Sequence, residues 1–135
     1  MKNIAYLILL IIHSSFGQIN VGTYKTISDL NFPPEITFFD NHTFVYSNKN
    51  SVSCFIWYEA KGTWKVNRDK IILTDSVKAF NKDLTETIYV NRKTIYSVEK
   101  DKLIFFFQSW ENSKPDYFLA NQIFGNFVFN REIKE

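Results

Sequence analysis

The chain has 135 residues, a formal net charge of +2, 18% aromatic residues, four Gly and three Pro. This length corresponds to one domain with a sizeable core, and the aromatic content excludes a disordered or low-complexity chain. Basic and acidic residues are interspersed rather than clustered, which argues against nucleic acid and anionic membrane surfaces as partners.

Residues 1–17 have the pattern of a secretory signal peptide. A lysine is followed by a short apolar run, Ile4 to Ile12, and the small residues Ser15 and Gly17 stand at the minus-three and minus-one positions. A membrane-spanning helix needs about 20 apolar residues, more than this run provides. We therefore expect cleavage after Gly17, a secreted or periplasmic protein, and a single domain over residues 18–135 with no membrane span.

Three stretches of the mature chain are typical of β-hairpins. In each, two runs with alternating apolar residues are joined by a short polar turn that contains Asp. The hairpins span residues 36–46, 64–73 and 96–105. The aspartates at these turns are explained by hydrogen bonding to the local backbone, without a bound cation.

The alternation also assigns side chains to the two faces of each strand, because successive residues point to opposite sides. Even positions from Cys54 to Val66 form the inner face of one strand, which leaves Phe55 and Trp57 facing outward. The other strands have inward aromatic positions as well. The inward aromatic residues assigned in this way are Phe44, Tyr46, Trp64, Tyr96, Phe127 and Phe129.

Two segments depart from simple alternation. Leu103–Phe107 is apolar on both faces, so a second element is expected to cover its outer side. The candidate is a short amphipathic helix or a strapped loop near 77–85, where apolar residues recur at helical spacing. Residues 85–98 form either two short strands with a turn at Asn91-Arg92 or one long bulged strand.

Counting all the segments gives roughly eight to ten antiparallel strands with short connections. The expected fold is all-β, an antiparallel up-and-down meander that hides its edges by closing into a small barrel or by folding into a sandwich.

Several residues resemble the sequence pattern of lipocalin barrels. Gly22-Thr23-Tyr24 resembles the Gly-x-Trp that opens those barrels, with Tyr in place of Trp, and Asp116-Tyr117 and Arg131 follow in comparable order. The wider layout is similar to uncharacterised small bacterial secreted proteins described as lipocalin-like. The resemblance implies a small lipocalin-like barrel, in which the arginine packs across the first-strand aromatic residue. Proteins of this architecture bind small ligands or inhibit other proteins.

Residues suited to catalysis are few. After signal removal the only histidine is His42 and the only thiol is Cys54, which alternation places on an inner face. No spacing typical of a metal site occurs. Asp40 and Asp75, at strand ends, are the only acidic residues that alternation allows inside. No catalytic residue, metal or cofactor is predicted, and the chain is not expected to be an enzyme.

Two hypotheses for function follow from the aromatic residues. In the first, Phe44, Tyr46, Trp64 and Tyr96 line a cavity that binds a small hydrophobic ligand, the alternative for these residues being a close-packed core. In the second, Phe55 and Trp57 form an outer surface that binds a protein or a glycan, an inhibitor of another protein being one example.

Overall fold

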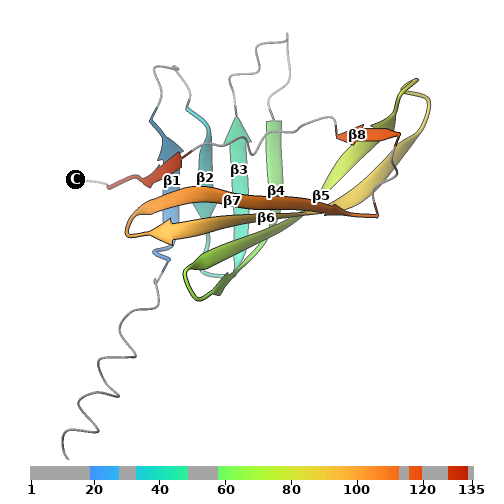
Figure 1. The fold of residues 1–135 in the computed structure, drawn as a ribbon. Helices are drawn as coiled ribbons and strands as arrows, with labels where there is room; N and C mark the ends of the chain where they lie inside the picture. Colours follow the sequence, from blue (N-terminus) through green and yellow to red (C-terminus); the bar gives the residue numbers. More distant parts are fainter. Residues whose placement is uncertain (1–18, 28–32, 49–57, 113–115, 120–127, 134–135) are drawn as a thin grey trace, which may run out of the picture.

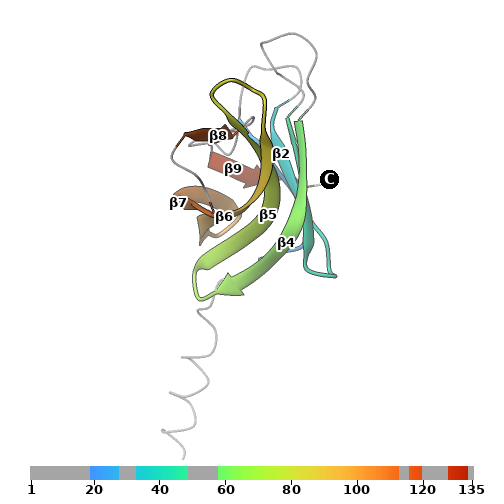
Figure 2. The same ribbon diagram turned by 90° about the vertical axis from the view of Figure 1, so that its right-hand side faces the viewer.

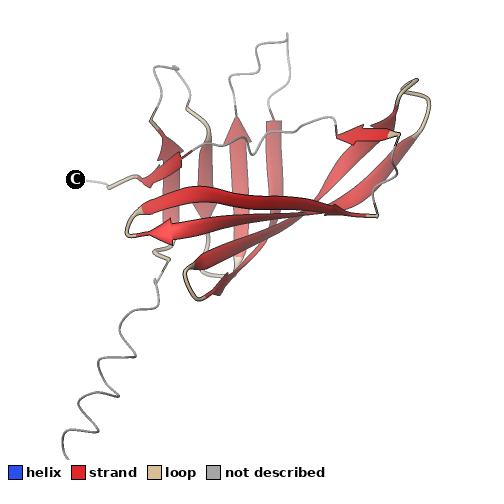
Figure 3. Cartoon of the chain, in the orientation of Figure 1, coloured by secondary structure: helices blue, strands red, loops and turns tan. Residues whose placement is uncertain are grey.

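The structure, a computed structural model, describes residues 19–27, 33–48, 58–112, 116–119 and 128–133 (Figure 1). The predicted signal peptide, the predicted interaction residues Phe55 and Trp57, and Cys54 lie outside these residues. All the regular elements of the described residues are β-strands (Figure 3). The strands are β1 Gly22–Thr26, β2 Glu35–Phe38, β3 Thr43–Asn48, β4 Tyr58–Asn67, β5 Lys70–Asn81, β6 Thr87–Glu99, β7 Lys102–Glu111, β8 Tyr117–Leu119 and β9 Val128–Arg131.

The strands close into a barrel. Their order is β4-β3-β2-β1-β9-β7-β6-β5-β8, every pairing is antiparallel, and an additional pairing of β4 with β5 completes the ring. Figure 2 shows β5 and β6 curving away from β4. The small strand β8 pairs only with the distal end of β5, at Ala79–Asn81, beyond the residues that β4 contacts. The predicted all-β meander that closes into a small lipocalin-like barrel is therefore confirmed.

The three predicted hairpins are β2–β3, β4–β5 and β6–β7. Their turns place one residue each in the left-handed region, His42, Arg68 and Lys100, with φ of 60°, 57° and 54°. The last two turns have the same two-residue length, because Asn67 pairs with Lys70 and Glu99 pairs with Lys102. Such tight turns match the right-handed twist of the flanking strands.

The predicted helix or strap near 77–85 is wrong. β5 continues to Asn81, and its buried residues in this stretch, Val77 and Ala79, alternate with exposed Lys78. Pairing with β6 runs without interruption from Lys70 to Phe80, and this long ladder fixes the strand period where three apolar residues had suggested a helical one. Residues 87–99 accordingly form one long strand, β6, rather than two.

Within the described residues no second element covers the outer side of Leu103–Phe107, and Phe106 and Phe107 are 61% and 50% exposed. The cause is an irregularity in the pairing of β6 with β7. Tyr96 pairs with Phe105 while Ile95 pairs with Phe107, so Phe106 is an extra residue in a β-bulge. Two apolar side chains therefore point outward in succession.

The barrel interior contains two apolar clusters. The smaller consists of Val77, Ala79 and Val90, near the end where β8 lies. Val66, expected to face inward, is exposed at the opposite end of β4. The larger cluster consists of Tyr24, Ile36, Phe38, Phe44, Tyr46, Ala60, Trp64, Ile71, Leu73, Tyr96, Val98, Leu103 and Phe129.

Gly62 allows β4 to approach its neighbours closely. A Cβ atom at this position would lie 2.1 Å from the carbonyl oxygen of Thr74 and 2.8 Å from Cε1 of Phe44. The missing side chain thus makes room for the Phe44 ring in the larger cluster and for the β4–β5 ladder that closes the barrel.

Candidate functional site

The four aromatic residues predicted to line a ligand cavity are brought together by the fold. Phe44, Tyr46, Trp64 and Tyr96 are all buried and belong to the larger apolar cluster. The Tyr96 and Tyr46 rings meet the Phe129 ring edge to face, with centroids 5.8 Å and 6.5 Å apart. These contacts make the four residues part of a packed aromatic core at this level of the barrel.

Trp64 lies at the end of the barrel formed by the β2–β3 turn. Its indole N–H donates a hydrogen bond to the carbonyl oxygen of Phe39 at 3.2 Å, and its ring lies 4.7 Å from the ring of His42. The Phe38 ring packs against it edge to face at 5.7 Å. Trp64 therefore helps to seal this end of the barrel.

Next to the aromatic core, the inner faces of β5, β6 and β7 carry polar side chains: Asp75, Arg92, Thr94 and Gln108. We call these residues the polar layer. Asp75 pairs directly with Arg92 across β5 and β6, and Thr94 pairs with Gln108 across β6 and β7. On β5 the layer lies between Leu73 of the larger cluster and Val77 of the smaller one, so it separates the two apolar clusters.

Asp75 and Arg92 form a buried, two-pronged ion pair. Arg92 Nε donates to Asp75 Oδ1 at 2.9 Å, and Arg92 Nη2 donates to Asp75 Oδ2. The side chains are 0% and 1% exposed for Arg92 and Asp75, respectively. Gln108 Nε2 donates to Thr94 Oγ1 at 2.9 Å. Two buried charges require this close pairing, because removing each ion from water costs roughly several kcal/mol of free energy.

Thr26 and Tyr96 each have a buried side-chain hydroxyl without a hydrogen-bond partner among the described residues, and the Tyr96 hydroxyl is the one near this network. It is fully buried and has no hydrogen-bond partner within the described part of the chain. Burial raises its pKa above the ordinary value of 10.0; the nearby Tyr46 raises that pKa further, whereas the Arg92 charge lowers it. A buried hydroxyl without a protein partner is uncommon in native proteins, and a hydrogen bond to a ligand or to a water molecule would satisfy it.

Sequence reasoning missed Arg92 and only partly identified Asp75. Arg92 was one of the two residues of a possible turn, yet it lies in the middle of β6. The signal that could have found it is the alternation of β6, because Thr94, Tyr96 and Val98 are buried at the following even positions. Asp40, the other acidic candidate for the interior, is exposed in the β2–β3 turn.

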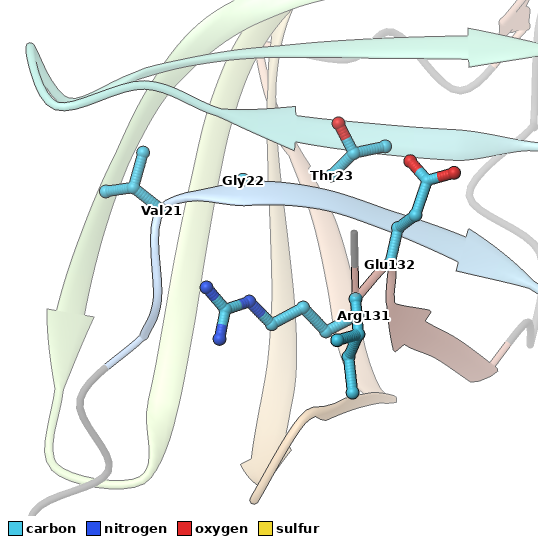
Figure 4. Close-up of a pocket in the computed structure, with 6 residues that line it drawn as sticks. Val21, Gly22, Thr23, Arg131 and Glu132 are labelled. Carbon is cyan, nitrogen blue, oxygen red and sulfur yellow. The ribbon is translucent and has the colours of Figure 1, made fainter. Parts of the chain in front are cut away.

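Two shallow hollows lie at the end of the barrel that carries the β2–β3 and β6–β7 turns, and both include Arg131. The first, about 440 Å³, is lined by residues 21–23 and 131–133 (Figure 4), and the second, about 500 Å³, by residues 99–102 and 130–131. Arg131 pairs with Tyr24 across β9 and β1, which agrees with the predicted position of the arginine across from the first-strand aromatic residue. Neither hollow is lined by the four predicted aromatic residues.

Other kinds of site receive no support within the described residues. His42 is exposed and its ring lies against Trp64, while Cys54, the only thiol in the sequence, falls outside those residues. No group of His, Cys, Asp and Glu in the described segments is arranged to hold a metal ion. None of those segments forms a helix of the length and apolar character needed to cross a membrane. No protein family model, curated protein or solved structure matches the chain significantly.

Proposed function

We propose that this barrel is a non-catalytic binding protein, exported from the cytoplasm, that takes a small and mainly apolar ligand into its interior beside the polar layer. The Tyr96 hydroxyl carries the proposal, because it is a buried hydrogen-bonding group that the described protein leaves without a partner. An eight-stranded barrel is wide enough either to be filled by its own side chains or to hold one small ligand.

The chemistry of the polar layer favours an uncharged polar group on the ligand. Arg92 and Asp75 neutralise each other through two hydrogen bonds, so the pair offers no net charge to attract an ion. A ligand hydroxyl or carbonyl could still exchange a hydrogen bond with the Tyr96 hydroxyl, which both donates and accepts. The apolar part of the ligand would lie against the neighbouring apolar side chains, among them Val77 and Val90.

The proposal revises the predicted lining of the site. Phe44 and Trp64 pack in the aromatic core, and we therefore assign them to the closed floor beneath the ligand rather than to its walls. Tyr96, and Tyr46 beside it, remain the predicted residues closest to the ligand, since Tyr46 and Arg92 are both near enough to influence the pKa of Tyr96.

The test uses Nile red, a neutral apolar dye with a carbonyl group, as the probe. Its fluorescence should rise when it is added to the mature protein, and native mass spectrometry of protein purified without detergent should show a copurified small molecule. Tyr96→Phe should weaken dye binding about fivefold, as expected for the loss of one hydrogen bond.

The matched control is Tyr24→Phe, because Tyr24 is also buried but its hydroxyl donates to the carbonyl oxygen of Asn20 at 3.1 Å. That variant should bind the dye as the unaltered protein does. The absence of both dye binding and a copurified molecule would contradict the proposal, and so would equal weakening by the two variants.

A further inference from the structure

The outer face of the barrel carries an apolar patch at the β7 bulge. Without the bulge, alternation would turn one of the two successive residues Phe106 and Phe107 into the barrel, whereas both are at least half exposed. Bulges of this kind re-aim side chains and are conspicuous features of functional surfaces. Clusters of exposed large apolar side chains also indicate a binding surface, because isolated exposed apolar side chains are common on proteins and clusters of them are not.

Cross-strand pairing extends the patch over β6 and β5. Phe107 pairs with Ile95, and Ile95 pairs with Ile72, so these three side chains lie in one row on the outer face; Ile95 is partly exposed, whereas Ile72 is only 8% exposed. In the adjacent row Ile104 pairs with Val128 of β9, which is also exposed. The patch therefore continues across four strands.

Lysines flank this patch. Lys65 of β4 continues the Phe107 row, Lys70 of β5 continues the Ile104 row, and Lys93 of β6 lies in the next row, opposite Thr74 and Ser109. The Lys70 ammonium lies 4.7 Å from the centre of the Phe106 ring and 2.8 Å from Asp69 Oδ2 in the neighbouring turn. Lys65 and Lys93 are exposed, and no acidic side chain of the described strands lies within these three rows. We call this apolar patch with its three lysines the lysine-flanked face.

We propose that the lysine-flanked face is a docking surface for a partner protein whose contact region combines acidic residues with an apolar centre. Protein interfaces typically have an aromatic, desolvated centre surrounded by a polar rim, and hot spots are enriched in aromatic residues. Here Phe106 and Phe107 supply the centre, and Lys65 and Lys93 supply a positive rim. Charge complementarity then requires carboxylates on the partner.

Two other occupants are less favourable. In a symmetric dimer formed through this face the same lysines would meet across the two-fold axis, and like charges placed opposite each other are repulsive. An anionic bilayer would gain only about 1 kcal/mol per lysine, and its attraction is strongest at the cytoplasmic leaflet, which the predicted export leaves behind. The surface is separate from the interior site, so it does not depend on ligand binding.

The experiment uses a carbodiimide, which joins a lysine amine directly to a carboxylate, on the exported protein in the cells that naturally produce it. We expect cross-linked peptides that join Lys65 or Lys93 to an Asp or Glu of one other protein, with a yield that falls as salt is raised. Phe107→Ser and Lys93→Glu should each lower that yield about tenfold, as the removal of an interface hot spot does.

A matched control changes an equivalent aromatic and lysine pair outside the face. Lys78 pairs with the exposed Tyr89, and its ammonium lies 5.9 Å from the centre of the Tyr89 ring. Tyr89→Ser and Lys78→Glu should leave the cross-link unchanged, and circular dichroism and thermal melting should show that all four variants fold.

Other results would overturn the proposal. Cross-links from Lys65 or Lys93 to a second copy of this chain would show that the face forms a homodimer. If no cross-link to another protein depends on Phe107, but the protein binds vesicles containing phosphatidylglycerol, the face would be a membrane-binding surface. The absence of any cross-link that depends on Phe107 would show that the face has no protein partner. None of these results bears on the Nile red measurement, so the two proposals fail separately.

Discussion

The Asp75–Arg92 pair allows stability and function to be separated by mutation. Replacing Arg92 with Met removes the guanidinium but leaves the Asp75 carboxylate buried with two hydrogen bonds lost. Breaking a buried pair in this way typically lowers the free energy of unfolding by about 3–5 kcal/mol. Since whole domains are stable by only about 5–15 kcal/mol, Arg92→Met should be severely destabilised.

The double variant Asp75→Val/Arg92→Met should behave differently. Apolar side chains at both positions would join the larger cluster at Leu73 to the smaller one at Val77, and no unpaired charge would remain. Comparable replacements elsewhere are neutral or stabilising by about 1–4 kcal/mol. We therefore expect the double variant to be at least as stable as the unaltered protein, and to bind Nile red more weakly because the polar layer is lost.

Urea unfolding, followed by the fluorescence of the three tryptophans, measures these free energies. Asp75→Val alone completes the cycle and gives the coupling energy of the pair. A loss of less than about 1 kcal/mol in Arg92→Met, the range of a solvated surface pair, would refute the buried geometry. A double variant as unstable as Arg92→Met would refute the idea that the pair is dispensable for stability.

Three further outcomes are expected. Gly62→Ala should lower the free energy of unfolding by about 3 kcal/mol or more, because the new Cβ would overlap the Thr74 carbonyl oxygen. Urea unfolding measures this free energy, and a decrease below about 1 kcal/mol would contradict the close approach of β4 and β5 at Gly62. Lys100→Gly should raise the melting temperature slightly, since glycine adopts the positive φ of 54° without strain; Lys102→Gly, in the strand, should not. Burial raises the pKa of Tyr96 above 10.0, so above pH 10 the unfolded chain binds fewer protons than the folded one, and the free energy of unfolding should fall as pH rises. Tyr96→Phe should flatten this fall when urea unfolding is measured across this pH range. An unchanged slope in that variant would contradict the burial of the Tyr96 hydroxyl.

The barrel interior and the outer face divide the functional argument between them. The polar layer faces inward from β5, β6 and β7, and the lysine-flanked face lies on the outer side of the same strands, with Lys65 of β4 and Val128 of β9 at its margins. This region of the sheet is therefore built on both sides with side chains that a purely structural barrel does not need: a buried ion pair inside and two exposed phenylalanines outside. The four strands β1–β4 show no comparable combination among their described residues.

The sequence by itself determined the class of the fold and the orientation of most side chains. Alternation is a local property of each strand, so it placed Phe44, Tyr46, Trp64 and Tyr96 in the interior, and the Asp-containing turns marked three hairpins. The arginine across from Tyr24 was also anticipated, from a resemblance in the order of residues.

Only the tertiary structure decided the rest, because it depends on which strands become neighbours. The ladder between β5 and β6 turned the expected helix near 77–85 into a strand, and it placed Asp75 opposite Arg92 although 17 residues separate them. The bulge at Phe106 arises from a mismatch between two strands, so neither strand alone reveals it. Burial of a charge pair and exposure of a phenylalanine pair are thus properties of strand register, which local sequence patterns do not encode.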